Sequence, residues 1–120
     1  MLLSVAVPAA SSADVRLLDA VRKADRKAVR ELLQNRADVN AAQPDGSTAL
    51  VLAADRNDLE VADLLIRANA NVNAANEYGA TALSVACASG NVAMIELLLD
   101  AKADPNAALL SGETPLMTAV

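Results

Sequence analysis

The side chains that could carry out chemistry are few in this chain of 120 residues. The sequence contains no histidine and a single cysteine, Cys87. Nucleophilic catalysis by serine or cysteine usually relies on a histidine base, and a zinc site needs several cysteine or histidine ligands. The residue types therefore support neither chemistry, and one cysteine cannot form an internal disulfide.

One acidic run, Asp55-Arg56-Asn57-Asp58-Leu59-Glu60, superficially resembles a calcium-binding loop. It lacks the central glycine and the terminal glutamate that such loops carry at fixed spacing. Acidic residues at the start of a helix are the better interpretation of Asp58 and Glu60. No glycine-rich phosphate loop with its lysine is present either. We predict a protein that is not an enzyme, with no catalytic residue, no cofactor and no metal.

The sequence repeats itself every 33 residues, without an insertion. Asparagine, glycine, threonine and leucine recur in register. The equivalent positions are Asn40, Asn73 and Asn106; Gly46, Gly79 and Gly112; Thr48, Thr81 and Thr114; and Leu50, Leu83 and Leu116. A fixed period of this length indicates stacked supersecondary units. Function is then expected on a surface rather than in an enclosed pocket.

Each unit contains the pattern of two short antiparallel helices. Apolar residues with helical spacing lie over 17–21 and 28–33, over 50–54 and 59–66, and over 83–87 and 92–99. Thr48 and Thr81 are predicted side-chain N-caps. Polar links over 37–47, 70–80 and 103–113 contain a glycine suited to a tight turn with positive φ. A fourth unit begins with Thr114 and Pro115, with proline at the first helical position.

Composition fits close packing of these helices. The chain is 54% hydrophobic, yet Tyr78 is its only aromatic residue. A core of leucine, valine, isoleucine and alanine lets helices approach each other closely. Cys87 is equivalent to Ala54 one unit earlier, and we expect it to be a small buried side chain.

Charge is distributed unevenly around a net value of −5. Residues 1–38 contain seven of the ten basic residues and five acids, whereas residues 39–120 contain three basic residues and ten acids. The basic residues alternate with acids and no aromatic residue accompanies them, so we predict no nucleic-acid binding. A solvated helix face with charge pairs explains the pattern better.

The first 13 residues carry no charge and do not share the repeat. An apolar run followed by small residues, with Ser11 and Ala13 before the boundary, resembles the end of a secretory signal peptide, although the basic n-region is missing. We expect export to the periplasm or the exterior, with a leader that packs on the first helix as the alternative. A membrane span needs about 20 apolar residues, so none is predicted.

These linked motifs resemble the ankyrin repeat over residues 14–120. The first helices of the second to fourth units open with Gly46-Ser47-Thr48-Ala49-Leu50, Gly79-Ala80-Thr81-Ala82-Leu83 and Gly112-Glu113-Thr114-Pro115-Leu116. The resemblance implies an all-α fold with short β-hairpin loops, a helical solenoid of about three repeats plus the start of a fourth. The expected parts are a leader over 1–13, a capping repeat over 14–44, repeats over 45–77 and 78–110, and a partial repeat over 111–120.

The chain departs from the family pattern in three ways. The histidine that follows the threonine-proline-leucine motif is replaced by Val51, Ser84 and Met117, so a hydrogen-bond network between neighbouring loops is missing. The glycine after each second helix is replaced by Arg36, Asn69 and Lys102, each costing about 1 kcal/mol if that position is left-handed. The last unit lacks its second helix. We interpret these features as a fragment of a longer array.

By the same resemblance, hairpin tips and the ends of the first helices form a concave surface that binds other proteins. The expected binding residues are Arg22, Lys23, Pro44, Asp45, Ser47, Asp55, Arg56, Glu77, Tyr78, Ala80, Ala88, Ser89, Leu110, Ser111 and Glu113. Tyr78 is the expected anchor, because tyrosine buries a large area at small entropic cost. The alternative is that an exposed tyrosine in a turn has no role.

We therefore predict a non-enzymatic, monomeric protein-interaction module with an unidentified protein partner. One alternative is the accessory repeat region of a larger secreted effector or enzyme whose catalytic part lies elsewhere. Another is an inhibitor whose acidic later repeats cover a basic partner. The fold does not identify the target, because binding residues vary on a constant scaffold.

Overall fold

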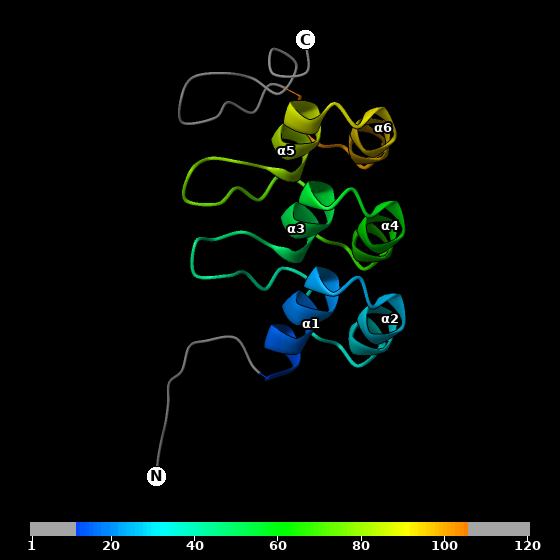
Figure 1. The fold of residues 1–120 in the computed structure, drawn as a ribbon. Helices are drawn as coiled ribbons and strands as arrows, with labels where there is room; N and C mark the ends of the chain where they lie inside the picture. Colours follow the sequence, from blue (N-terminus) through cyan, green and yellow to red (C-terminus); the bar gives the residue numbers. More distant parts are fainter. Residues whose placement is uncertain (1–11, 106–120) are drawn as a thin grey trace.

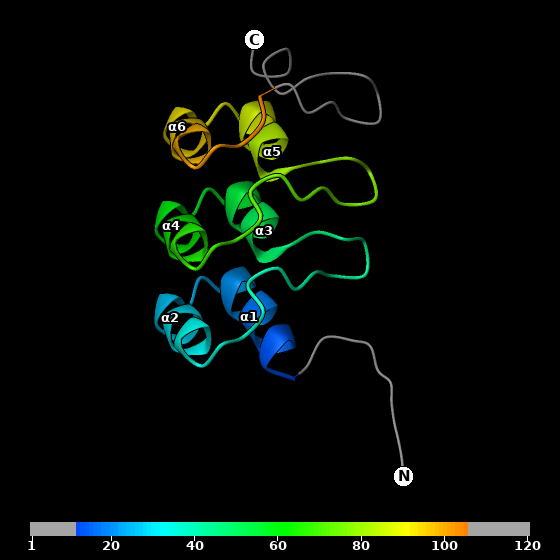
Figure 2. The same cartoon turned by 180° about the vertical axis from the view of Figure 1, so that it is seen from behind.

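The computed structural model describes residues 12–105, which contain six helices and no strand. The helices are α1 (Ser12–Arg22), α2 (Arg26–Gln34), α3 (Ala49–Asp55), α4 (Leu59–Arg67), α5 (Ala82–Ser89) and α6 (Val92–Asp100). They form three stacked pairs in two columns, an inner column of α1, α3 and α5 and an outer column of α2, α4 and α6 (Figure 1). The links after α2 and α4 extend from the inner column, away from the outer helices (Figure 2).

Side-chain caps explain where four of these helices begin. Asp25, Thr48, Asp58 and Thr81 each accept a hydrogen bond from the backbone N–H three residues later. The predicted caps Thr48 and Thr81 are confirmed, as is the helix start at Asp58. Ser84 completes a capping box, because its hydroxyl accepts from the Thr81 N–H at 2.9 Å.

The first helix begins earlier than predicted. The expected leader extended to residue 13 and the capping repeat began at Asp14, whereas α1 begins at Ser12 and places Asp14 in its first turn. A carboxylate is favourable there, because it faces the unpaired N–H groups of the helix start. The other leader residues, 1–11, and the partial repeat over 111–120 lie outside the described residues.

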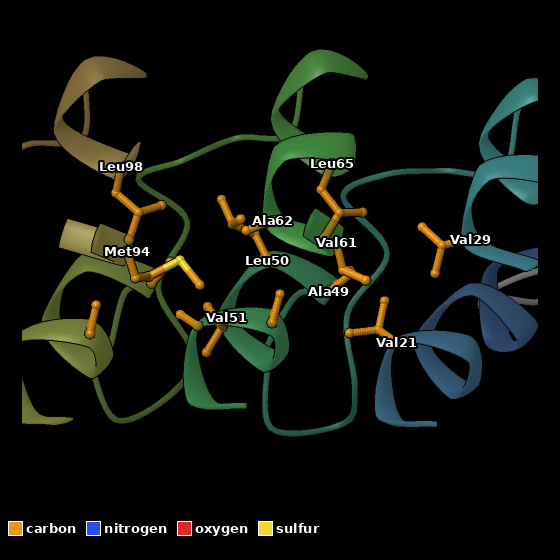
Figure 3. Close-up of a cluster of buried hydrophobic side chains, with 14 of the residues drawn as sticks. Val21, Val29, Ala49, Leu50, Val51, Val61, Ala62, Leu65, Met94 and Leu98 are labelled. Atoms are coloured by element: carbon orange, nitrogen blue, oxygen red, sulfur yellow. The ribbon is translucent and has the colours of Figure 1, made fainter. Parts of the chain in front are cut away.

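The core runs through all three helix pairs (Figure 3). Its largest fully buried side chains include Leu17, Leu50, Leu65, Leu83 and Leu98. Fully buried alanines, among them Ala49, Ala53 and Ala86, line the inner column and allow its helices to approach closely. Cys87 is buried as predicted, and burial raises the pKa of its thiol.

The residue after each second helix has the left-handed backbone that the family glycine would favour. Arg36, Asn69 and Lys102 have φ values of 66°, 69° and 74°. The left-handed assignment is therefore confirmed. Arginine and lysine pay a steric cost here that asparagine reduces and glycine avoids.

The periodic asparagines join one unit to the next. Asn40 Oδ1 accepts from the Asn71 backbone N–H at 2.7 Å, and Asn73 Oδ1 accepts from the Asp104 N–H at 2.7 Å. These bonds explain why asparagine recurs at this position. We call them the asparagine staples.

The first unit has no preceding asparagine in the repeat register. There Asp14 Oδ1, at the start of α1, accepts from the Asp38 N–H at 2.7 Å. The acceptor is therefore supplied by α1 itself.

The predicted β-hairpin loops are present as tight turns rather than as strand pairs. Among the described residues only one isolated bridge occurs, between Ala42 and Thr48. In the first hairpin the Gln43 N–H donates to the Ser47 carbonyl at 2.9 Å, and in the second the Asn76 N–H donates to the Ala80 carbonyl at 3.0 Å. One such bond in each hairpin is too few to form a ladder.

Candidate protein-binding surface

The two described hairpins, residues 42–48 and 75–81, are rigid because their turns are closed by side chains as well as by backbone. Asp45 Oδ1 accepts from the Ser47 N–H at 2.9 Å, and this bond lowers the pKa of the Asp45 carboxyl. Asn76 Oδ1 accepts from both the Tyr78 N–H at 2.9 Å and the Ala80 N–H at 3.0 Å. Each hairpin therefore has one defined shape.

The second hairpin is stacked directly on the first. The Glu77 N–H donates to the Asp45 carbonyl at 2.8 Å, and the Asn76 side-chain amide donates to the Ser47 hydroxyl at 3.1 Å. Gly46 has a φ of 87°, and a Cβ there would lie 3.2 Å from the Asn76 Cα. Glycine is therefore favoured at this position, both by the turn conformation and by the close approach of the second hairpin.

Pro44 occupies the position equivalent to Glu77. Because proline has no N–H, the first hairpin cannot donate the corresponding hydrogen bond on its other side. Proline at an exposed edge is one way in which proteins prevent further pairing. The second hairpin therefore donates a backbone hydrogen bond to its neighbour at Glu77, whereas the first hairpin cannot donate one at Pro44.

Tyr78 lies near the tip of the second hairpin, with 62% of its surface exposed. Its backbone is fixed by the bond to Asn76, whereas its ring is left accessible. An accessible aromatic side chain on a fixed backbone can be buried by a partner without first ordering the loop.

Most of the other predicted binding residues are accessible. Those exposed are Arg22, Lys23, Pro44, Asp55, Arg56, Glu77, Ala88 and Ser89, and those half-buried are Asp45 and Ala80. Ser111 and Glu113, together with Leu110, lie outside the described residues. Ser47 is different, since only 4% of it is exposed and its hydroxyl is bonded to Asn76. Ser47 connects the hairpins and offers no surface to a partner.

The basic residues at the α1 end of this surface already have acidic or polar partners within the chain. Lys23 Nζ lies 3.0 Å from Asp19 Oδ2, and Arg22 lies 3.9 Å from the same carboxylate. Arg22 Nε also donates to the Gln43 side chain at 3.1 Å, which ties α1 to the first hairpin. This contact of Gln43 was not predicted, although Gln43 holds the repeat position of Asn76, whose side chain also forms hydrogen bonds.

Two shallow apolar grooves were not predicted. One lies beside the first hairpin and is lined by Val15, Leu18, Arg22, Ala42, Gln43 and Pro44. The other lies between α4 and α6 and is lined by Leu59, Glu60, Asp63, Ala93 and Leu97. The signal for the second was available in the sequence, since Leu59 and Ala93 replace the charged residues Arg26 and Glu60 of the preceding unit.

Within residues 12–105, no group of three or more potential metal-binding side chains occurs. None of the six helices in this part of the chain is long and apolar enough to cross a membrane. The arrangement offers rigid turns, an exposed aromatic ring and shallow grooves, which are features of a binding surface.

Comparison with known protein families matches residues 17–108 to the model of ankyrin repeats in three copies. The comparison with curated proteins gives no match. Because the family model covers most of the chain, the protein belongs to the ankyrin repeat family. The resemblance and the all-α repeat fold that the sequence indicated are therefore confirmed.

Proposed function

We propose that this member of the ankyrin repeat family binds a protein partner through its hairpin tips and inner helices, with Tyr78 as the main contact. Ankyrin repeats are generally protein–protein interaction modules. The observation that supports this particular surface is the exposed Tyr78 ring on a hairpin that is fixed by Asn76 and stacked on the first hairpin. Such anchors dominate binding energy at many interfaces.

Polar side chains surround this anchor. Glu77 is exposed beside it, and Asp55 and Arg56 are exposed at the end of α3. A hydrophobic anchor with a polar rim is the usual organisation of a non-obligate interface. The partner that fits it has an apolar pocket for the ring and mixed hydrogen-bonding groups around that pocket.

The test begins with the complete chain as bait, so that a captured partner can be identified and purified. Affinity is then measured for the native chain, for Tyr78→Ala and for Lys27→Ala, a control on α2 far from the hairpins. We expect Tyr78→Ala to weaken binding at least tenfold, consistent with a loss of about 2 kcal/mol at an anchor. Lys27→Ala should have little effect, and both variants should keep the native thermal midpoint. Equal affinities for native chain and Tyr78→Ala would refute the assignment.

A further inference from the structure

The outer helix column contains two equivalent helix–helix junctions, which we call the first groove, between α2 and α4, and the second groove, between α4 and α6, where the surface is hollowed. The 33-residue repeat makes Arg26 equivalent to Leu59, and Glu60 equivalent to Ala93. The two grooves therefore differ in side chains on a common backbone.

The first groove is closed by charged side chains. Arg26 Nε lies 3.3 Å from Glu60 Oε2 and 3.6 Å from Asp58 Oδ1. The Arg26 side chain is 48% exposed, whereas the Asp58 side chain is only 7% exposed. Arg26 thus bridges from α2 to the start of α4 and covers the surface between them.

The second groove has no such bridge within the described residues. Leu59 takes the place of the arginine and Ala93 the place of the glutamate, and together with Leu97 they make its lining mostly apolar. Leu59 is 38% exposed, and Val92, the next equivalent position, is 65% exposed. Helices at a protein surface normally turn their apolar side chains inward. Here these apolar side chains are accessible to a partner.

The surroundings of this groove are acidic. Glu60 and Asp63 line it, and α4 and α6 together carry four acidic residues, these two with Glu96 and Asp100, against one basic residue, Arg67. Glu60 is paired with Arg26, and Asp63 with Arg67 at 3.0 Å, while Glu96 and Asp100 make no ion pair within the described residues. By contrast, α2 carries three basic residues and one acid. The net negative charge of α4 and α6 therefore favours cationic groups over phosphate at this groove.

We propose that the groove between α4 and α6 binds a basic amphipathic helix of a protein partner. The apolar stripe of that helix would cover Leu59, Ala93 and Leu97, with its lysines or arginines beside Glu60 and Asp63. A shallow channel between two side-by-side helices suits a third helix laid along it. Each nine-residue helix is about 13 Å long, which accommodates two to three turns of the partner. The acidic surroundings make nucleic acid or an anionic membrane a poor occupant.

The test uses a synthetic helical peptide with leucines on one face and lysines on both flanks, compared with a peptide in which glutamates replace the lysines. We expect the lysine peptide to bind the complete native chain at low salt, with an affinity that falls as salt is raised. The glutamate peptide should bind at least tenfold more weakly. Equal binding of the two peptides would overturn the proposal.

A charge-neutral variant separates the groove from general attraction to an acidic protein. Leu59→Arg combined with Ala93→Glu reproduces the Arg26–Glu60 pair of the first groove and leaves the net charge unchanged. It should reduce affinity for the lysine peptide at least tenfold. Leu59→Asn, which removes the apolar contact without adding charge, should weaken binding in the same direction, and circular dichroism establishes that both variants are folded. Unchanged affinity in both folded variants would refute the proposal.

Tyr78→Ala distinguishes this surface from the hairpin surface. Because Tyr78 lies on the second hairpin and the groove lies on the outer column, this substitution should alter peptide affinity by less than twofold. A large loss in Tyr78→Ala would place the peptide on the hairpin side and overturn the groove assignment. The two proposed surfaces can thus succeed or fail separately.

Discussion

The interface between the first and second units and the interface between the second and third share one backbone arrangement but are closed differently. Both have an asparagine staple of 2.7 Å. On the outer column, however, the first interface adds the Arg26 ion pairs, whereas the second exposes Leu59 and Ala93. The comparison shows which contacts hold the stack and which side chains are free to vary for binding. Four stability predictions follow from it, all measured by urea unfolding of the complete chain.

The largest effect is expected in the core that both interfaces share. Leu65 and Leu98 are equivalent and fully buried, so replacing either with alanine should lower the free energy of unfolding by about 2–5 kcal/mol. Leu65→Ala should be the more damaging, because α4 is packed between α2 and α6 and has less freedom to collapse into the cavity. An unchanged urea midpoint in either variant would show that the packing is wrongly assigned.

The staples should contribute equally to the two interfaces. Asn40→Ala and Asn73→Ala each remove one side-chain acceptor, and we expect each to cost about 1 kcal/mol. Asn40→Asp is the matched control, because it keeps an acceptor oxygen in place, as Asp14 does for Asp38. A clear loss in Asn73→Ala alone would mean that the Arg26 ion pairs compensate at the first interface.

Glycine substitutions at the left-handed positions after α2 and α6 should raise the free energy of unfolding instead of lowering it. Arg36→Gly and Lys102→Gly relieve steric strain at positive φ and should stabilise by up to about 1 kcal/mol, partly offset by the greater entropy of glycine in the unfolded chain. Asn69→Gly is the control, with a smaller gain expected because asparagine tolerates this conformation better. Destabilisation of both the Arg36 and the Lys102 variants would mean that those side chains make contacts worth more than the strain.

The smallest effect on stability is expected at Arg26, whose ion pairs are present at the first interface and have no counterpart among the described residues at the second. Arg26→Ala removes an exposed ion pair with Glu60 and a longer one with the buried Asp58, and it should lower the free energy of unfolding by about 0.2–1 kcal/mol. High salt should reduce the difference from the native chain, since exposed charge pairs are screened. Glu31→Ala, on the same helix, serves as the control. A loss independent of salt would indicate that the arginine stem acts through packing instead.

Much of this fold could be predicted from the sequence, because the repeat period and the residue types at the repeated positions indicated the same structure. The 33-residue register predicted the stacking, Thr48 and Thr81 predicted their helix starts, and Leu65 and Leu98 predicted the core. The glycine that the family carries after each second helix indicated that Arg36, Asn69 and Lys102 are left-handed. These features depend on local backbone preferences and on which residues share one helix face, and both are properties of the sequence.

Contacts between units were decided only by the tertiary structure. Ser47 looked like an accessible turn residue, yet the second hairpin covers it and bonds to its hydroxyl. The partner of Asn40 is the backbone of Asn71, and that of Arg26 is a pair of carboxylates one unit later. Spacing alone cannot show whether a polar side chain reaches its neighbour or the solvent, because that depends on distances across the stack. The sequence of this protein therefore determined the repeat and its core, and stacking determined which surfaces were closed and which remained open.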